Sequence, residues 1–368
     1  MQKVALVSYH YFRNYGTCLQ AFALQHVITH HFKVDCEYLD FGQSEYPGMF
    51  SKQSIWSEIK LFRRKLLALK YTIADEKSTK QFKRFKNEYL KISRRFQLDD
   101  LTHVEDQYSA FIVGSDQTWN PMACSKAYYP PMLLSFVKSS KKKFSYAPSM
   151  GNIDNVRTVE TLLKKSLCDY NMLSTREKAS TNYLSKILER DVSLVLDPTM
   201  LLTPEEWMKI TSNHKVKYLD YVFCYLLGSR DIAFEFAHNL AKQNNKKLIV
   251  IALNNKYKER ADIYPSGIGP LEFVQLIANA DYVVTDSFHG TAFSLNFSKQ
   301  FYSFYKREGG RDLSDNRRIY DLLDIFGLCH RIVDENSSNN NYYEIAEVSI
   351  SEERLNSFQY LGNIFKNR

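Results

Sequence analysis

The sequence predicts an α/β protein with two Rossmann-like domains, each built on a doubly wound parallel sheet. Short apolar runs typical of buried strands alternate with helical patterns almost from end to end. The chain has 368 residues, which is too long for one ordinary core and suits two domains of about 150 to 200 residues. The alternation is interrupted near 200–216, where Asp197-Pro198-Thr199 and Thr203-Pro204 are typical of turns.

The expected elements follow in order along the chain. A strand, a helix and a second strand open the first domain, at 4–7, 19–24 and 34–39. Its further strands are expected at 110–113, 143–147, 172–175 and 194–196. The second domain is expected to hold strands at 221–226, 247–251 and 282–284, with helices at 233–241 and 271–278. A surface loop at 336–343 and a helix from Ser351 to Phe365 end the chain. We therefore expect domains at 1–205 and 206–345, followed by a C-terminal helix within 346–368.

Composition indicates two sizeable cores and no membrane span. Hydrophobic residues make up 44% of the chain and aromatic residues 14%. No apolar run approaches the ~18 residues that cross a bilayer, and the first residues resemble a strand rather than a signal peptide. The cysteines form no CxxC pair and are expected to be reduced; they are Cys18, Cys36, Cys124, Cys168, Cys224 and Cys329. These features predict a cytoplasmic protein.

The positive charge is concentrated in one segment. The formal net charge is +8, yet Lys60 to Arg95 alone contains thirteen Lys and Arg residues against three acids, a local net charge of +10. Apolar residues recur there at helical spacing, which predicts a basic helical insertion at about 50–100 in the N-terminal half; they are Ile55, Ile59, Phe62, Leu66, Leu69, Phe82, Phe85 and Tyr89. Two interpretations stay open, because the helix pair could pack on its domain or let 55–95 contact an anionic membrane surface peripherally. No nucleic-acid motif accompanies the charge, so no nucleic-acid partner is expected.

The segment most typical of a ligand site is 280–294. An apolar strand ends at Thr285, and a helix is expected to begin near His289 or Gly290. Ligands bind at the carboxyl ends of the strands in open α/β sheets, and a helix start offers N–H groups to a phosphate. The polar side chains there are Asp286, Ser287, His289 and Thr291. Histidine can transfer a proton near neutral pH, whereas Asp286 or Ser287 could simply cap the helix.

Three more strand ends carry polar residues. Arg176 follows the strand at 172–175, and its planar fork suits a phosphate or carboxylate, although it could equally pair with Glu177 at the surface. The turn at 10–17 lacks the GxGxxG pattern and gives no support for a dinucleotide. Residues 113–121 would suit a sugar, with Asp116 and Gln117 binding hydroxyls and Trp119 stacking on a ring, or could form a well-capped loop. No segment has the spacing of a metal site, a Walker loop or GxSxG, so neither a metal nor a cofactor is expected.

Six segments, in this order, resemble the polysaccharide pyruvyl transferase family. They are Asn14-Tyr15-Gly16 with Leu19-Gln20, Ile112 to Gln117, Tyr146 to Ser149 with Gly151, Arg176-Glu177, Leu196 to Thr199, and Ala280 to Gly290. The resemblance covers about residues 3–330. It implies a glycosyltransferase-B-like pair of Rossmann-type domains with the active site between them. By analogy with such transferases, the C-terminal helix packs back on the first domain.

The resemblance also implies the reaction and the role of each residue. The donor is phosphoenolpyruvate, the acceptor is a sugar diol of a glycan or lipid-linked oligosaccharide, and the product is a cyclic pyruvate ketal in cell-surface polysaccharide biosynthesis. The implied catalytic residues are His289, Arg176 and Asp286. The implied donor-binding residues, in the second domain, are Ser287, Gly290, Thr291, Lys306, Arg307 and Arg317. The implied acceptor-binding residues, in the first domain, are Asn14, Tyr15, Gly16, Asp116, Gln117 and Trp119.

One departure from the family concerns the donor. Some members have Arg two residues before this His, where this chain has Ser287. The contact that this Arg makes with the anion must then be absent, or be made by another residue such as Lys306 or Arg317. A nucleotide-sugar-dependent glycosyltransferase on the same fold stays open as the alternative function, and a non-catalytic glycan-binding or membrane-binding protein as a third.

Overall fold

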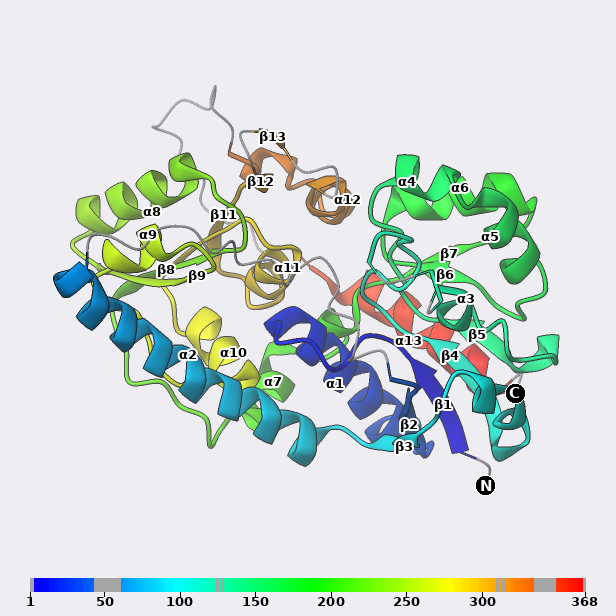
Figure 1. Ribbon diagram of the computed structural model, residues 1–368. Coiled ribbons are helices and arrows are strands. Elements are labelled where there is room, and N and C mark those ends of the chain that lie inside the picture. Colours follow the sequence, from blue (N-terminus) through cyan, green and yellow to red (C-terminus); the bar gives the residue numbers. More distant parts are fainter. Residues whose placement is uncertain are drawn as a thin grey trace. The chain divides into compact units, whose positions relative to one another are not determined.

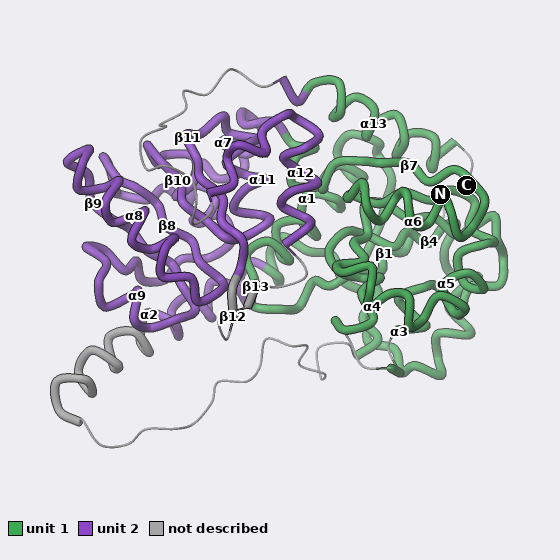
Figure 2. The backbone as a smooth tube through the Cα atoms, turned by 90° about the horizontal axis from the view of Figure 1, so that it is seen from above, with its two compact units in different colours: residues 1–53, 86–202, 351–368 green, residues 54–85, 203–350 purple. Residues whose placement is uncertain are grey.

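The chain folds into two compact α/β units. Figure 1 shows a computed structural model that describes residues 3–42, 61–123, 126–127, 129–308, 311–312, 316–333 and 349–366. Unit 1 combines residues 1–53, 86–202 and 351–368, and unit 2 combines 54–85 and 203–350 (Figure 2). Each unit has its own parallel sheet, so the expected pair of α/β halves is confirmed.

The sheet of unit 1 is parallel throughout and has the order β3-β2-β1-β4-β5. Its strands are β1 (Lys3–Val7), β2 (Cys36–Asp40), β3 (Ile92–Arg95), β4 (Tyr108–Val113) and β5 (Lys143–Ser145). Strands β2 and β3 lie on one side of β1, and β4 lies on the other side. The strand order therefore reverses between β1 and β4, which is where open α/β sheets bind ligands.

Helix α1 (Tyr15–His30) begins just after β1 because Asn14 caps it. The Asn14 side chain accepts a hydrogen bond from the backbone N–H of Thr17 at 3.1 Å. The amide of Gln25 donates to the Lys91 carbonyl at 2.9 Å and accepts from the Lys91 N–H at 2.8 Å. The Tyr38 hydroxyl donates to the Ala21 carbonyl at 2.8 Å. These bonds hold α1 against β2 and the start of β3, with its N-terminus at the carboxyl end of β1.

The rest of unit 1 contains a short parallel pair, β6 (Ser174–Thr175) and β7 (Ser193–Leu194). Its other helices are α3 (Tyr129–Met132), α4 (Ile153–Arg157), α5 (Glu160–Leu167), α6 (Lys178–Leu188) and α13 (Ser351–Lys366). Helix α13 is anchored by two side chains: the Ser357 hydroxyl accepts from the Leu196 N–H at 2.9 Å, and the Tyr360 hydroxyl donates to the Ser145 carbonyl at 2.9 Å. The C-terminal helix thus packs on unit 1.

The sheet of unit 2 is also parallel and has the order β11-β10-β8-β9. Its strands are β8 (Tyr221–Leu226), β9 (Lys247–Ala252), β10 (Tyr282–Thr285) and β11 (Gln300–Ser303). Its helices are α7 (Pro204–Ile210), α8 (Asp231–Gln243), α9 (Asn255–Glu259), α10 (Pro270–Ala278), α11 (Phe288–Asn296) and α12 (Arg317–Ile325), and a short antiparallel ribbon joins β12 (Arg307–Glu308) to β13 (Arg311–Asp312). The order reverses between β8 and β10, which is the second predicted ligand position.

The basic segment differs from the expectation in two ways. It forms one continuous helix, α2 (Leu61–Tyr89), rather than a pair, and the strand β3 follows it. In addition, 54–85 groups with unit 2 and not with the N-terminal half. The physical reason is that Asp75 accepts from the Tyr264 hydroxyl at 2.9 Å and pairs with Lys258 at 3.4 Å, both in unit 2.

The apolar residues Phe82 and Phe85 of α2 are buried, as the packing interpretation requires of this part of the helix. Residues 55–60 and the side chains of 61–73 lie outside the described residues, as do Cys124 and the expected loop at 336–343. A membrane contact of the segment stays a prediction. Within the described residues, no helix combines the length and the apolar composition needed to cross a membrane.

Candidate functional site

The start of helix α11 is fixed tightly to the end of strand β10. The Thr285 hydroxyl donates to the Tyr225 carbonyl at 2.7 Å and accepts from the Ser287 N–H at 3.1 Å. The Ser287 hydroxyl caps the helix by accepting from the Gly290 N–H at 3.3 Å. A Cβ at position 290 would lie 3.1 Å from Thr285 Cβ, so only glycine lets helix and strand approach this closely. His289 lies in this first turn of α11 with 7% of its surface exposed.

Asp286 holds the neighbouring loop instead of facing a substrate. Its side chain is fully buried, and its two carboxylate oxygens accept from the N–H groups of Leu227 and Gly228 at 2.7 and 2.8 Å. Burial raises the pKa of this carboxyl, against the opposing effects of Lys306 and of the two N–H groups. The catalytic role expected for Asp286 is therefore corrected to a positioning role: it joins the loop after β8 to the end of β10.

Two of the residues that were expected to bind the donor substrate are hydrogen-bonded or paired with other residues of unit 2. The Thr291 hydroxyl is buried, donates to the Ser287 carbonyl at 3.1 Å and shares a hydrogen bond with Ser303 at 2.8 Å, which makes it a structural residue. Arg317 begins helix α12 with 60% of its side chain exposed, and pairs with Asp321 at 2.8 Å. The fork of Arg317 is thus turned to solvent and neutralised, contrary to the expectation.

Lys306 fits the expected donor site best. It follows β11, is only 9% exposed and lies close enough to Asp286 to lower the pKa of that carboxyl. The Asn316 side chain holds both backbone polar groups of Lys306. Its carboxamide accepts from the Lys306 N–H at 2.7 Å and donates to the Lys306 carbonyl at 3.0 Å. The side chain of Arg307 lies outside the described residues.

Two buried arginines at the same edge of the sheet were missed by the sequence analysis. Arg318 is 5% exposed, and its guanidinium carbon lies 5.9 Å from the centroid of the Phe288 ring. Arg230, equally buried, donates to the Tyr305 carbonyl at 3.2 Å. A signal for Arg318 existed, because it lies four residues before the buried Leu322 and so shares the inward face of α12.

In unit 1, the structure brings two predicted acceptor segments together where the strand order reverses. Asp116 accepts from the Thr17 hydroxyl at 2.6 Å, which joins the end of β4 to the start of α1 beside Asn14, Tyr15 and the buried Gly16. Asp116 adopts a positive φ of 72° and also accepts from the Gln117 N–H at 2.9 Å. Both Asp116 and Gln117 keep part of their surface exposed, as sugar-binding side chains require.

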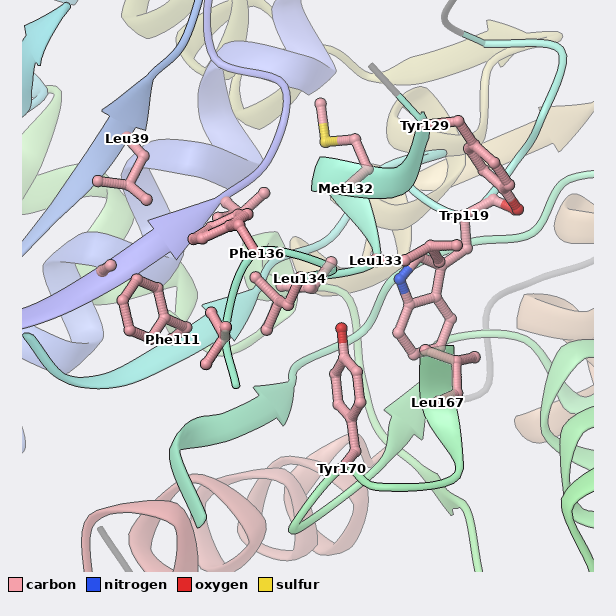
Figure 3. Close-up of a cluster of buried hydrophobic side chains, with 14 of the residues drawn as sticks. Leu39, Phe111, Trp119, Tyr129, Met132, Leu133, Leu134, Phe136, Leu167 and Tyr170 are labelled. Carbon is pink, nitrogen blue, oxygen red and sulfur yellow. The ribbon is translucent and has the colours of Figure 1, made fainter. Parts of the chain in front are cut away.

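Trp119 does not have the position expected of a sugar-stacking residue. Its side chain is fully buried in the core cluster of unit 1 and meets the Tyr170 ring edge-on, with the centroids 6.1 Å apart (Figure 3). A ring with no exposed face cannot stack on a sugar. The stacking role expected for Trp119 is therefore corrected to a core role.

Arg176 is likewise internal. It pairs with Glu177 at 2.9 Å and with Asp197 at 2.7 Å, and it donates to the Ser115 hydroxyl at 3.1 Å, all without exposed side-chain surface. These two carboxylates raise the pKa of the guanidinium against its burial, which by itself acts in the opposite direction. Two carboxylates already neutralise Arg176, so the structure replaces the expected anion clamp with a buried ion-pair network.

No group of three or more His, Cys, Asp or Glu side chains in the described part of the chain is placed to hold a metal ion. Each unit has its own group of candidate site residues. Unit 2 contributes His289 with the buried cations Lys306, Arg318 and Arg230. Unit 1 contributes the hydrogen-bonding loops around Asp116.

Comparison with solved structures finds the same fold in sugar-nucleotide enzymes. The UDP-GlcNAc 2-epimerase of Neisseria meningitidis, bound to UDP-GlcNAc, is similar with a TM-score of 0.54 and 12% identity, covering 100% of both chains. The UDP-N-acetylglucosamine 2-epimerase of Rickettsia bellii has a TM-score of 0.51 and 14% identity, covering 100% of this chain and 96% of that one. The S. aureus MnaA–UDP structure has a TM-score of 0.50 and 12% identity, covering 99% and 98%. These likenesses show the glycosyltransferase-B-like fold class.

Comparison with curated protein sequences found no match. The family model for polysaccharide pyruvyl transferases, in contrast, matches residues 14–305, which is most of the chain. This range includes the α1 start, the loop around Asp116, and the β10–α11 junction with His289. The chain therefore belongs to the polysaccharide pyruvyl transferase family and is a transferase.

Proposed function

We propose that the protein transfers the pyruvyl group of phosphoenolpyruvate onto a sugar diol of a glycan or lipid-linked glycan precursor, forming a cyclic ketal. The observation that carries the proposal is that two functional groups lie at the carboxyl end of β10. His289 lies in the first turn of α11, and the buried Lys306 lies close enough to Asp286 to lower the pKa of that carboxyl. Phosphoenolpyruvate carries about three negative charges near neutral pH, from its phosphate and its carboxylate. A buried cation beside a helix N-terminus suits such an anion.

The reaction itself needs proton transfer and no redox cofactor. One sugar hydroxyl attacks C2 of the donor while C3 gains a proton and becomes the methyl group. The second hydroxyl then attacks C2, and the C–O bond to phosphate breaks. One hydroxyl proton is balanced by the new methyl hydrogen, and the other leaves with hydrogen phosphate. No oxidant or reductant is consumed, so we propose a cofactor-free reaction.

Within this scheme His289 carries a proton between the acceptor hydroxyl and C3, because imidazole can accept and donate near neutral pH. Lys306 stabilises the charge on the donor and on the departing phosphate. In unit 1, the partly exposed Asp116 and Gln117 would bind hydroxyls of the acceptor. Asp286 contributes indirectly by holding the loop after β8.

The alternative is transfer from a nucleotide sugar. The epimerase of Neisseria meningitidis was solved with UDP-GlcNAc and the S. aureus protein with UDP, and a diphosphate would also suit a basic helix start. The two functions differ in the donor, so one binding experiment separates them.

The test is thermal unfolding of the full chain with phosphoenolpyruvate, UDP or UDP-GlcNAc. A ligand at one hundred times its dissociation constant stabilises the folded state by ~2.7 kcal/mol, which raises the unfolding midpoint measurably. We expect a shift with phosphoenolpyruvate in the wild type and in H289A, but a much smaller one in K306Q. The buried Lys258 of α9 provides the matched control, because K258Q removes a similarly buried amine that pairs with Asp75 of α2.

Activity completes the test. Wild type should release phosphate from phosphoenolpyruvate only when a glycan diol is present, and H289A should bind the donor without turnover. A shift with UDP-GlcNAc and none with millimolar phosphoenolpyruvate would replace the proposal with glycosyl transfer. We further infer a cytoplasmic reaction, with peripheral membrane contact if the acceptor is lipid-linked.

A further inference from the structure

We propose that Arg318 binds the phosphate group of the donor, in the place left uncharged by Ser287. This inference rests on the proposed function and names a residue of the same site that the sequence analysis did not identify. Three features support this role: the connection of Arg318 to Lys306, the position of Arg318 over the first turn of α11, and the exposed, paired state of Arg317.

Arg318 and Lys306 lie on backbone segments that are joined by hydrogen bonds. Asn316, two residues before Arg318, makes both of its hydrogen bonds to the Lys306 backbone, at 2.7 and 3.0 Å. The start of α12 is therefore fixed to Lys306, three residues after the end of β11. Two cations on connected backbone segments suit a phosphate dianion, which needs more than one positive partner.

Arg318 is also fixed over the turn that carries His289. Its guanidinium lies 5.9 Å from the centroid of the Phe288 ring, and α12 packs on α11 within unit 2 (Figure 1). The Phe288 ring meets the His289 ring edge-on, with the centroids 5.2 Å apart, so the cation and the proposed proton carrier both contact the same aromatic ring. Arg318 is 5% exposed and therefore keeps little contact with water, which strengthens its interaction with an anion.

The neighbouring residues cannot supply this charge. Ser287 is neutral and uses its hydroxyl to cap Gly290 at 3.3 Å. Arg317 is 60% exposed and paired with Asp321. Of the two adjacent arginines at the start of α12, Arg318 is therefore the one that faces the interior of unit 2.

The experiment compares R318Q with R317Q and with R260Q, which removes another exposed, carboxylate-paired arginine of unit 2. Each full-length variant is titrated with phosphoenolpyruvate, inorganic phosphate and pyruvate, and binding is measured by calorimetry. R318Q should weaken phosphoenolpyruvate and phosphate by about tenfold or more, because a charge-assisted, forked contact is lost. Pyruvate, which lacks the phosphate, should bind R318Q and wild type alike. R317Q and R260Q should stay within about twofold of wild type, as expected of surface ion pairs.

The outcomes separate this inference from the function on which it rests. If wild type binds no phosphoenolpyruvate, the proposed function itself fails. If wild type binds it and R318Q binds equally well, Arg318 only stacks on Phe288 and the inference fails, as it does if R317Q is the weakened variant. Should R318Q not fold, R318K retains the charge without the fork. Phosphate product inhibition of R318K must then weaken in parallel with a raised KM for phosphoenolpyruvate, and an unchanged inhibition constant would overturn the inference.

Discussion

Replacing Gly290 with alanine tests the close approach of α11 to β10 that positions His289. A Cβ at this position would lie 3.1 Å from both Cβ and Cγ2 of Thr285 and closer still to its hydroxyl oxygen. Thr285 cannot move aside, because it is fully buried and its hydroxyl bridges the Tyr225 carbonyl and the Ser287 N–H. The helix start must therefore shift, and with it the imidazole in the same turn.

Two opposing effects set the size of the change. Alanine in a helix is favoured over glycine by up to about 1 kcal/mol. Inserting a methyl group into a packed contact costs about 1–3 kcal/mol, and the upper part of this range applies where the neighbour is held by its own hydrogen bonds. We expect G290A to lower the free energy of unfolding by about 1–2 kcal/mol, with a larger proportional loss of kcat than of donor affinity.

The matched control is G362A in helix α13. There the added Cβ would lie 3.5 Å from a Phe32 ring carbon, which is an ordinary contact. The helix preference then acts alone, so G362A should raise the free energy of unfolding by up to about 1 kcal/mol. Urea denaturation of both variants measures the opposite signs, and T285A/G290A should be more stable than the sum of the single changes predicts. The reasoning is refuted if G290A is as stable as wild type, or if the double mutant shows no coupling.

Three further predictions concern residues whose environment is now known. R176Q should lower the free energy of unfolding by about 3–5 kcal/mol, because the buried carboxylates of Asp197 and Glu177 lose the cation that they share. Urea denaturation measures this loss, and a change below about 1 kcal/mol would contradict the buried network. W119A should cost about 3–5 kcal/mol by leaving a core cavity, while the acceptor KM of the folded protein stays unchanged; a raised KM at unchanged stability would restore the stacking role. Burial lowers the pKa of His10 to about 4, so the unfolded chain binds a proton at higher pH than the folded one. The stability that neutral His10 contributes is present above pH 6.5 and is lost as the pH falls towards 4, by at most roughly 3 kcal/mol, and H10Q should flatten this part of the stability–pH curve.

Most strands of the two sheets were predictable because they are apolar and buried on both faces, although the largely buried β11 was missed. Strand β8 was expected at 221–226 and is found at Tyr221–Leu226, where every residue is buried. Strand β3 (Ile92–Arg95) was missed for the opposite reason: it lies at the edge of its sheet and ends in the exposed Arg94 and Arg95. Within a basic segment, such a strand cannot be told from the polar face of a helix.

The sequence predicted where the candidate site residues lie in the fold, but not which residues they contact. Strand ends identified the β10–α11 junction and the loop around Asp116, because parallel strands bring their carboxyl ends to one edge. The sequence could not show that Arg176 meets Asp197, since that pairing depends on how the segments between them fold. Nor could it separate Arg317 from Arg318, because adjacent residues on a helix point about 100° apart and only packing decides which one faces inward.

In each unit, the charges near the point where the strand order reverses indicate which substrate that unit suits. At the edge of unit 1, Arg176 is neutralised by two carboxylates, and what remains exposed is hydrogen-bonding capacity on Asp116 and Gln117. Such a surface suits neutral hydroxyls and disfavours an anion. At the edge of unit 2, Lys306 lies near the buried Asp286, whose oxygens accept from two N–H groups, and Arg318 lies over the Phe288 ring. Under the proposed function, we therefore expect the donor, with about three negative charges, to bind to unit 2. We expect the uncharged sugar diol to bind to unit 1, where its hydroxyls can form hydrogen bonds.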